Sequence, residues 1–165
     1  MKALHALLDG IDRFFGFDTA YAHCDIPCGI YDPHAAQMAA HTVIRMADLI
    51  AALPKDNTVE TMHKLVRYTA VKEEHAELCK REIRILWGDY FKHEHLEQNP
   101  ELQELIWNAL KLGSEARQKT DVKTAEELLS VVEKIAEIFW KTKGVETKRI
   151  EAFYPTKREI VYPKV

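Results

Sequence analysis

Apolar residues recur at helical spacing along four segments of the chain, and strand-like alternation is almost absent. Each segment starts at a polar cap residue, and three of the four stop at a proline or glycine. The expected boundaries are Asp32-Pro33 to Pro54, Asn57 or Thr58 to Tyr90, Asn99-Pro100 to Gly113, and Thr120 or Asp121 to Gly144. Four helices joined by short links predict an all-α, up-and-down four-helix bundle over residues 33–143.

The two ends of the chain differ from this helical middle. Residues 144–165 hold five bases, three acids and two prolines, and we expect a tail that packs on a neighbour or stays mobile. Within this tail, only residues 159–165 alternate in the manner of a strand.

The first 22 residues end in Ala20-Tyr21-Ala22, a small-x-small pattern, but charges at Asp9, Asp12 and Arg13 interrupt the apolar core that a secretory signal needs. Residues 1–22 are therefore either a helix docked on the domain or a removable leader that is not a secretory signal. In both cases we expect a cytoplasmic protein.

Composition and charge narrow the function classes. Of the 165 residues, 47% are hydrophobic and 30% charged, which is typical of one folded domain. The net charge of -3 offers no basic field for nucleic acid, so we expect no nucleic-acid partner. No apolar run is long enough to cross a bilayer, so we expect no membrane partner either.

The chemistry is concentrated just before the first helix, where His23, Cys24 and Cys28 fall within a few residues. Cys-x3-Cys is not the spacing of a zinc knuckle, and a loop with incidental thiols is one interpretation. A chain that began at His23 would offer more. Its α-amine, the Cys24 amide and the Cys24 thiolate would form two fused five-membered chelate rings, which peptide planarity keeps coplanar. With the Cys28 thiolate, this square-planar N2S2 set suits Ni(II) or Cu(II), and the imidazole of His23 could approach along the axis.

The stretch His23-Cys24-Asp25-Ile26-Pro27-Cys28-Gly29-Ile30-Tyr31-Asp32-Pro33 resembles the nickel hook of nickel-containing superoxide dismutases. A second stretch, Leu86-Trp87-Gly88-Asp89-Tyr90-Phe91-Lys92, resembles the central helix of the same family and its exit. The resemblance runs from His23 to about Lys143. It implies a homohexamer of four-helix-bundle subunits that converts superoxide to oxygen and hydrogen peroxide through a Ni(III)/Ni(II) cycle, with one nickel ion per subunit.

The resemblance also implies the roles of single residues. His23 would supply the amine and the axial imidazole, Cys24 the amide and a thiolate, and Cys28 the second thiolate. Asp25, Tyr31 and Tyr90 would shape the approach of superoxide. Pro27 and Gly29 would set the turn of a hook over residues 23–32, and a processing peptidase would remove residues 1–22.

This chain departs from the family pattern at two positions. Better-known members steady the axial imidazole with a glutamate on the first helix and an arginine on the second, where this chain has Ala39 and His75. Either His75 and a carboxylate such as Glu74 replace them, or another subunit supplies the partner.

Other candidates have simpler interpretations. Cys79 lies on the apolar line of the second helix and is expected in the core. Glu60 and His63 have di-iron spacing but only once, which favours a solvated helix face. His93 and His95 are expected in an exposed loop. The second hypothesis for function is a non-catalytic metal-binding or thiol-redox helical protein, in which Cys24 and Cys28 form a reversible disulfide.

Overall fold

The computed structural model describes residues 28–164 of the chain. Four long helices make up most of it: α2 (His34–Ala51), α3 (Val59–Ile85), α5 (Leu102–Gln118) and α6 (Val122–Thr142). A π-helical turn, η1 (Leu86–Tyr90), continues α3, and a short helix α4 (His93–Gln98) follows it. Two strands, β1 (Thr147–Glu151) and β2 (Glu159–Pro163), complete the chain.

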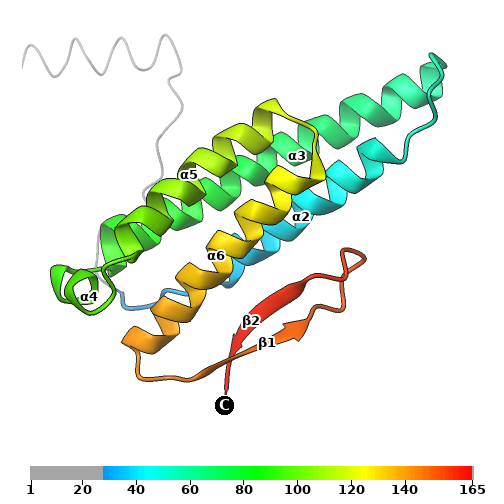
Figure 1. Ribbon diagram of the computed structural model, residues 1–165. Coiled ribbons are helices and arrows are strands. Elements are labelled where there is room, and N and C mark those ends of the chain that lie inside the picture. The colour runs from blue at the N-terminus through cyan, green and yellow to red at the C-terminus, as the bar shows by residue number, and fades with distance from the viewer. Residues whose placement is uncertain (1–27, 165) are drawn as a thin grey trace, which may run out of the picture.

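The long helices form a closed ring of neighbours, as Figure 1 shows. Helix α2 packs on α3 and α6, and α5 packs on the same two helices, so successive helices run up and down around one core. The predicted four-helix bundle is confirmed. Its core is rich in small residues, and α2 presents Ala36, Ala39, Ala40, Val43 and Ile44 to it with exposed fractions of at most 1%. Alanine on the inner face lets neighbouring helices approach closely.

Most helix boundaries follow the predicted caps. Thr58 caps α3 by accepting the Thr61 amide at 3.2 Å, and Asp121 caps α6 by accepting the Thr124 amide at 2.8 Å. Gly144 has a φ of 70°, the left-handed conformation that ends a helix, just after α6.

Two boundary predictions were wrong. Helix α5 continues past Gly113 to Gln118. Gly113 lies inside it because the Lys80 side chain of α3 passes close by, and a Cβ at this position would come within 2.6 Å of that side chain. His93 and His95 lie in the short helix α4 rather than in a loop. The Lys92 amide donates to Nδ1 of His95 at 3.2 Å, which caps this helix.

A buried lysine holds α3 against the end of α5. Lys72 is 1% exposed, and its ammonium donates to the backbone carbonyls of Ala116, Arg117 and Lys119. These carbonyls lie at the end of α5, where the helix leaves acceptors without partners. Burial lowers the pKa of Lys72. The polar middle of the second helix therefore contains an internal cap as well as solvated residues.

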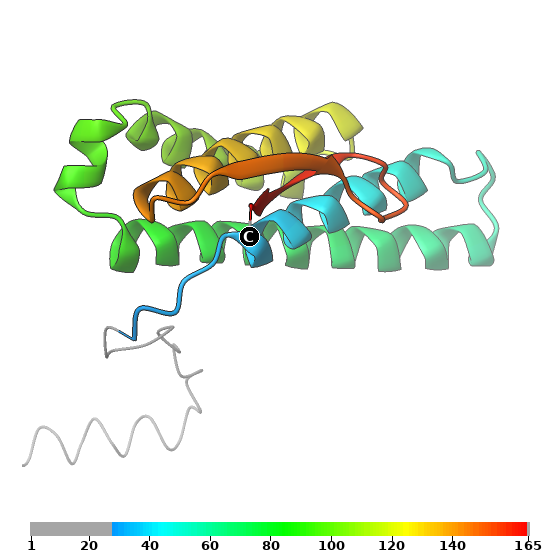
Figure 2. The same ribbon diagram turned by 90° about the horizontal axis from the view of Figure 1, so that it is seen from below.

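The C-terminal segment is an antiparallel hairpin that covers α2 and α6 (Figure 2). The expected tail was wrong for this segment, whereas the strand-like alternation from Glu159 is confirmed by β2. Gln37 of α2 bonds both backbone groups of Val161: its Nε2 donates to the carbonyl at 3.1 Å, and its Oε1 accepts the amide at 2.8 Å. Ile160 and Val161 are almost fully buried.

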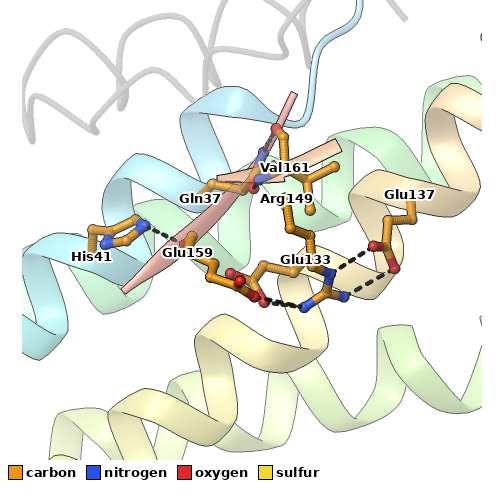
Figure 3. A network of polar contacts seen from close by, with 7 residues as sticks. All are labelled: Gln37, His41, Glu133, Glu137, Arg149, Glu159 and Val161. Carbon is orange, nitrogen blue, oxygen red and sulfur yellow. Dashed lines mark hydrogen bonds and ion pairs between the residues drawn. The ribbon is translucent and has the colours of Figure 1, made fainter. Parts of the chain in front are cut away.

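Ion pairs fix the outer strand of the hairpin on α6 (Figure 3). Arg149 of β1 donates to both oxygens of Glu137, at 2.7 and 3.0 Å, and to Oε2 of Glu133 at 2.7 Å. A second arginine, Arg158, donates to Glu126 at 2.8 Å. These ion pairs tie the hairpin to α6, and the Gln37–Val161 hydrogen bonds tie it to α2.

Candidate functional site

The described part of the hook is an irregular segment that enters α2. Cys28, Gly29 and Ile30 are exposed, Tyr31 is half-buried and Pro33 is buried. Gly29 has a φ of 72°, which a residue with a side chain adopts only at a cost, so this position favours glycine. Asp32 accepts the backbone amide of His34 at 2.7 Å, which fixes how the segment joins the helix.

Tyr31 and Tyr90 lie side by side, although 59 positions separate them in the printed sequence. Their ring centroids are 5.6 Å apart and their planes are inclined by 52°. The fold thus brings together the two tyrosines that the sequence singled out, and Tyr31 follows Cys28 by three positions in the chain.

The π-helical turn determines where Tyr90 lies. The amide of Phe91 donates to the carbonyl of Leu86 at 2.9 Å, a span of five residues in place of the usual four. Such a turn adds one residue to the helix and changes the direction in which the following side chains point. Sequence periodicity alone treated Tyr90 as the last apolar position of a regular helix.

Aromatic rings enclose Tyr90. Its ring centroid lies 4.5 Å from Phe139, 5.3 Å from Phe91 and 5.6 Å from His95, which stacks on it at 23°. The Tyr90 hydroxyl is 2.7 Å from Oγ1 of Thr142, in the last turn of α6. These contacts leave Tyr90 half-buried in a fixed orientation.

A cation lies beside this group of rings. The ammonium of Lys143 is 5.4 Å from the Tyr90 centroid and 5.1 Å from the Phe139 centroid. Lys143 takes part in no ion pair within residues 28–164. Its positive charge therefore remains available to attract an anion towards the tyrosine pair.

Sequence reasoning missed three of the residues around Tyr90. Phe139, Thr142 and Lys143 are separated by three and four positions on α6, a spacing that places side chains on one face of a helix. That spacing was the available signal. Only the packing of α6 against η1 shows that this face of α6 is the one that contacts Tyr90.

Of the two cysteines in the described chain, Cys28 is the one suited to bind a metal. Cys28 is a free, exposed thiol, whereas burial raises the pKa of Cys79 to about 12 and keeps that thiol protonated. Cys79 is fully buried, which confirms its predicted place in the core. Across residues 28–164, no three His, Cys, Asp or Glu side chains are close enough together to hold a metal ion. Glu60 and His63 are exposed, as expected. His23, Cys24 and Asp25 lie outside the described residues, as do Pro27 and the predicted leader.

Ala39 and His75 do not make the contacts expected of the glutamate and arginine that the family pattern has at these two positions. Ala39 is 1% exposed in the core, and its methyl group cannot bind an imidazole. His75 places Nδ1 2.9 Å from the carbonyl of Val71, so Nδ1 carries the proton and donates. Nε2 is the nitrogen through which His75 can contact another group.

Comparisons with known proteins agree on one family. The family model described as nickel-containing superoxide dismutase matches residues 18–143. A curated "Superoxide dismutase [Ni]" of Streptomyces seoulensis is 41% identical over 122 residues, which is 74% of this chain and 88% of the relative. The protein of the same name from Streptomyces coelicolor is 39% identical over 125 residues, 76% of this chain and 91% of the relative.

Solved structures give the same result. A native nickel superoxide dismutase is 39% identical with a TM-score of 0.67, and covers 74% of this chain and 99% of its own. A structure with nickel ligation of the oxidised state is 41% identical, with the same TM-score and the same coverage. Part of the chain outside the family match, residues 144–165, contains the hairpin.

Proposed function

The chain belongs to the family of nickel-containing superoxide dismutases, and from this premise we propose that it converts superoxide to oxygen and hydrogen peroxide at a nickel ion held by residues 23–28. The observation that carries the proposal is the family match across residues 18–143, which includes the whole hook. Nickel would supply a one-electron couple between Ni(III) and Ni(II), which accepts an electron from one superoxide and returns it to a second. No helix of the described chain is long and apolar enough to span a membrane.

His23, Cys24 and Cys28 are the proposed ligands. The α-amine and imidazole of His23, the amide and thiolate of Cys24, and the Cys28 thiolate together make a set of nitrogen and sulfur donors. The free, exposed thiol of Cys28 supports its part in this set. Anionic sulfur and amide donors from these residues would stabilise the higher oxidation state of a bound nickel ion and so lower its potential towards that of superoxide.

Asp25, Tyr31 and Tyr90 are proposed to shape the path of the substrate. The contact between Tyr31 and Tyr90, with centroids 5.6 Å apart, supports this role. The two rings in contact form an aromatic boundary beside which water and a small anion could be ordered.

Removal of residues 1–22 by a peptidase is proposed as the activating step. With the leader attached, the nitrogen of His23 is an amide whose lone pair is delocalised, and it cannot bind a metal as an amine. A free α-amine has a pKa of about 7.7–8.0, and metal binding favours its deprotonated form.

The active form is proposed to be a cytoplasmic homohexamer. The first half of α3 supports association, because Val59, Met62 and Val66 are 80%, 48% and 67% exposed. Apolar side chains clustered on an exposed helix face are typical of a surface that another subunit covers. Light scattering of the nickel-loaded protein would give the mass of six chains if this is correct, and of one chain if it is wrong.

Chains that begin at Met1, Ala22, His23 and Cys24 test the proposed site directly. Each is offered nickel, and its metal content, its N-terminus by intact mass, and its rate of superoxide decay are measured. Only the chain that begins at His23 should bind nickel stoichiometrically and be fully active. Full activity of the Met1 chain with its leader intact would overturn the mechanism. Zinc or no metal in an inactive His23 chain would favour the thiol-redox alternative, which predicts a reversible disulfide between Cys24 and Cys28.

A further inference from the structure

The hydrogen bond between Tyr90 and Thr142 has a fixed direction. Each hydroxyl has one proton, and the 2.7 Å contact between them leaves open which one donates. The Thr142 hydroxyl, however, also donates to the backbone carbonyl oxygen of Phe139 at 2.7 Å, and a carbonyl oxygen can only accept a hydrogen bond. The single Thr142 proton is therefore used there, and the proton between the two side chains must come from Tyr90.

The end of α6 explains why Thr142 donates to Phe139. In a regular helix the Lys143 amide would donate to that carbonyl, but here it donates to Trp140 at 3.0 Å. The Phe139 carbonyl therefore has no amide donor from Lys143, and the Thr142 hydroxyl donates to it instead. Tyr90 O–H, Thr142 O–H and the Phe139 carbonyl thus form one relay with a single direction.

We propose that Thr142 is a positioning residue for the dismutase reaction, because it holds the Tyr90 hydroxyl as a hydrogen-bond donor to the protein. Tyr90 then acts on the substrate path as a fixed aromatic wall and a hydrogen-bond acceptor, and does not supply a proton. Dismutation consumes two superoxide ions and two protons to form one oxygen and one hydrogen peroxide, so both protons come from other groups or from water. The inference rests on the proposed role of Tyr90 beside the nickel site.

The surroundings of Tyr90 are consistent with a fixed wall. His95 stacks on one side of the ring, and Phe139 packs at 4.5 Å. The Lys92 amide donates to Nδ1 of His95, which holds that ring in place in turn. Rotation of the Tyr90 ring about its own axis leaves the hydroxyl where it is, so Thr142 is the contact that orients the O–H bond.

Thr142→Val and Thr142→Ser form a matched pair of tests. Valine keeps the shape of threonine and removes the hydroxyl, whereas serine keeps the hydroxyl. We expect the ¹³Cζ resonance of labelled Tyr90 to move in T142V and to return in T142S, measured on the nickel-free chain that begins at His23. An unchanged resonance in T142V would overturn the inference, because the hydrogen bond would then be absent.

Activity separates positioning from packing. In nickel-loaded protein, T142V should lower kcat/KM for superoxide by about two- to tenfold, the worth of one hydrogen bond, with normal nickel content. T142S should restore it. Equal losses in both variants would mean that threonine acts through its methyl group, and would overturn the role of the hydroxyl.

Tyr90→Phe distinguishes failure of this inference from failure of the proposed site. We expect Y90F to lose about as much activity as T142V, the double variant to lose no more, and the solvent deuterium isotope effect to stay that of the wild type. A changed isotope effect would show that Tyr90 transfers its proton, which overturns the inference and keeps the site. Wild-type activity in Y90F and T142V, with a moved resonance, would overturn both.

Discussion

The hook end of the bundle and the C-terminal hairpin are built in opposite ways. The proposed nickel ligands lie within six consecutive residues, 23–28, and the family match includes them. The hairpin lies outside that match and is held by residues of two helices, among them Gln37 of α2, which bonds Val161 across 124 positions, and Glu133 of α6, which pairs with Arg149. Metal chemistry here depends on a short local sequence, whereas the hairpin depends entirely on the folded bundle.

The two regions nevertheless meet on α2. The hook enters the first turn of this helix, and β2 lies along it: the rings of His34 and Tyr162 are 5.7 Å apart, and Gln37 bonds Val161 one turn further on. The comparison predicts that changes in the hook abolish activity and spare the fold, and that changes in the hairpin do the reverse.

Cys28→Ser should have the largest effect. Serine is a much weaker, harder donor, so activity should fall by more than about 100-fold, since even partners of metal ligands are worth 10–100-fold. The helical circular dichroism and the unfolding midpoint should barely change, because Cys28 is exposed. Cys79→Ser is the matched control: it places a hydroxyl in the core, and should lower stability while nickel still binds. A fully active C28S variant would contradict the proposal that the hook binds the catalytic nickel ion.

Arg149→Ala should weaken the hairpin. The change removes the cation between Glu133 and Glu137 and leaves Glu133, whose side chain is 6% exposed, without its partner. We expect a loss on the order of 2 kcal/mol in the free energy of unfolding, measured with urea at pH 8. Lys148→Ala, on the exposed side of the same strand, should cost little. A drop in activity without any loss of stability would contradict the expectation that changes in the hairpin affect the fold and spare the activity.

Glu133 should make stability depend on pH. Burial raises the pKa of Glu133 to about 7, from 4.5 in the unfolded chain; Arg149 opposes this shift, and Glu159 and Glu137 add to it. Because the folded pKa is the higher one, its contribution to stability is complete below about pH 4.5 and is lost as pH rises through about 7. Glu133→Gln should remove this loss, measured as unfolding free energies at pH 5 and pH 8.5.

A second group in the hairpin region titrates in the opposite sense. Burial lowers the pKa of His41, so its contribution is present above the unfolded value of 6.5 and is lost as pH falls. The Nε2 proton of this neutral ring donates to the Glu159 carbonyl at 3.0 Å, and Nδ1 accepts from Thr156. Because His41 is unchanged in E133Q, the difference in unfolding free energy between wild type and E133Q isolates the contribution of Glu133 to the pH dependence. Identical pH profiles would show that Glu133 is ionised throughout.

Lys143→Gln should have the smallest effect. Loss of this charge beside the tyrosine pair should slow the reaction with superoxide about two- to threefold at low salt, and the difference should shrink as ionic strength rises. Lys123→Gln makes the same change of charge at the other end of α6 and should leave the rate unchanged. Equal rates for both variants at low salt would exclude steering by Lys143.

Much of the fold could be predicted because its signals are local. Asp121 and Gly144 delimit α6 as expected, and the apolar spacing of α2 and α6 identified their inner faces. Gly113 was misjudged because a glycine within a helix and one at its end look the same in sequence, and only Lys80 of the neighbouring helix distinguishes them. The hairpin was missed as a folded element because its outer strand carries charges at Lys148, Arg149 and Glu151, and the sequence does not show that Arg149 pairs with Glu133 and Glu137 of α6.

By itself, the sequence determined the ligand chemistry. Donor atoms a few bonds apart in a peptide have few ways to meet, so the identity and order of residues 23–28 predict a square-planar donor set for a chain that begins at His23. The tertiary structure alone decided the surroundings of that site. Tyr31, Tyr90 and Thr142 belong to three separate segments, and only bundle packing and one π-helical turn bring them together. The direction of the Tyr90 hydrogen bond depends in turn on one backbone carbonyl at the end of α6, because a hydroxyl has a single proton to give.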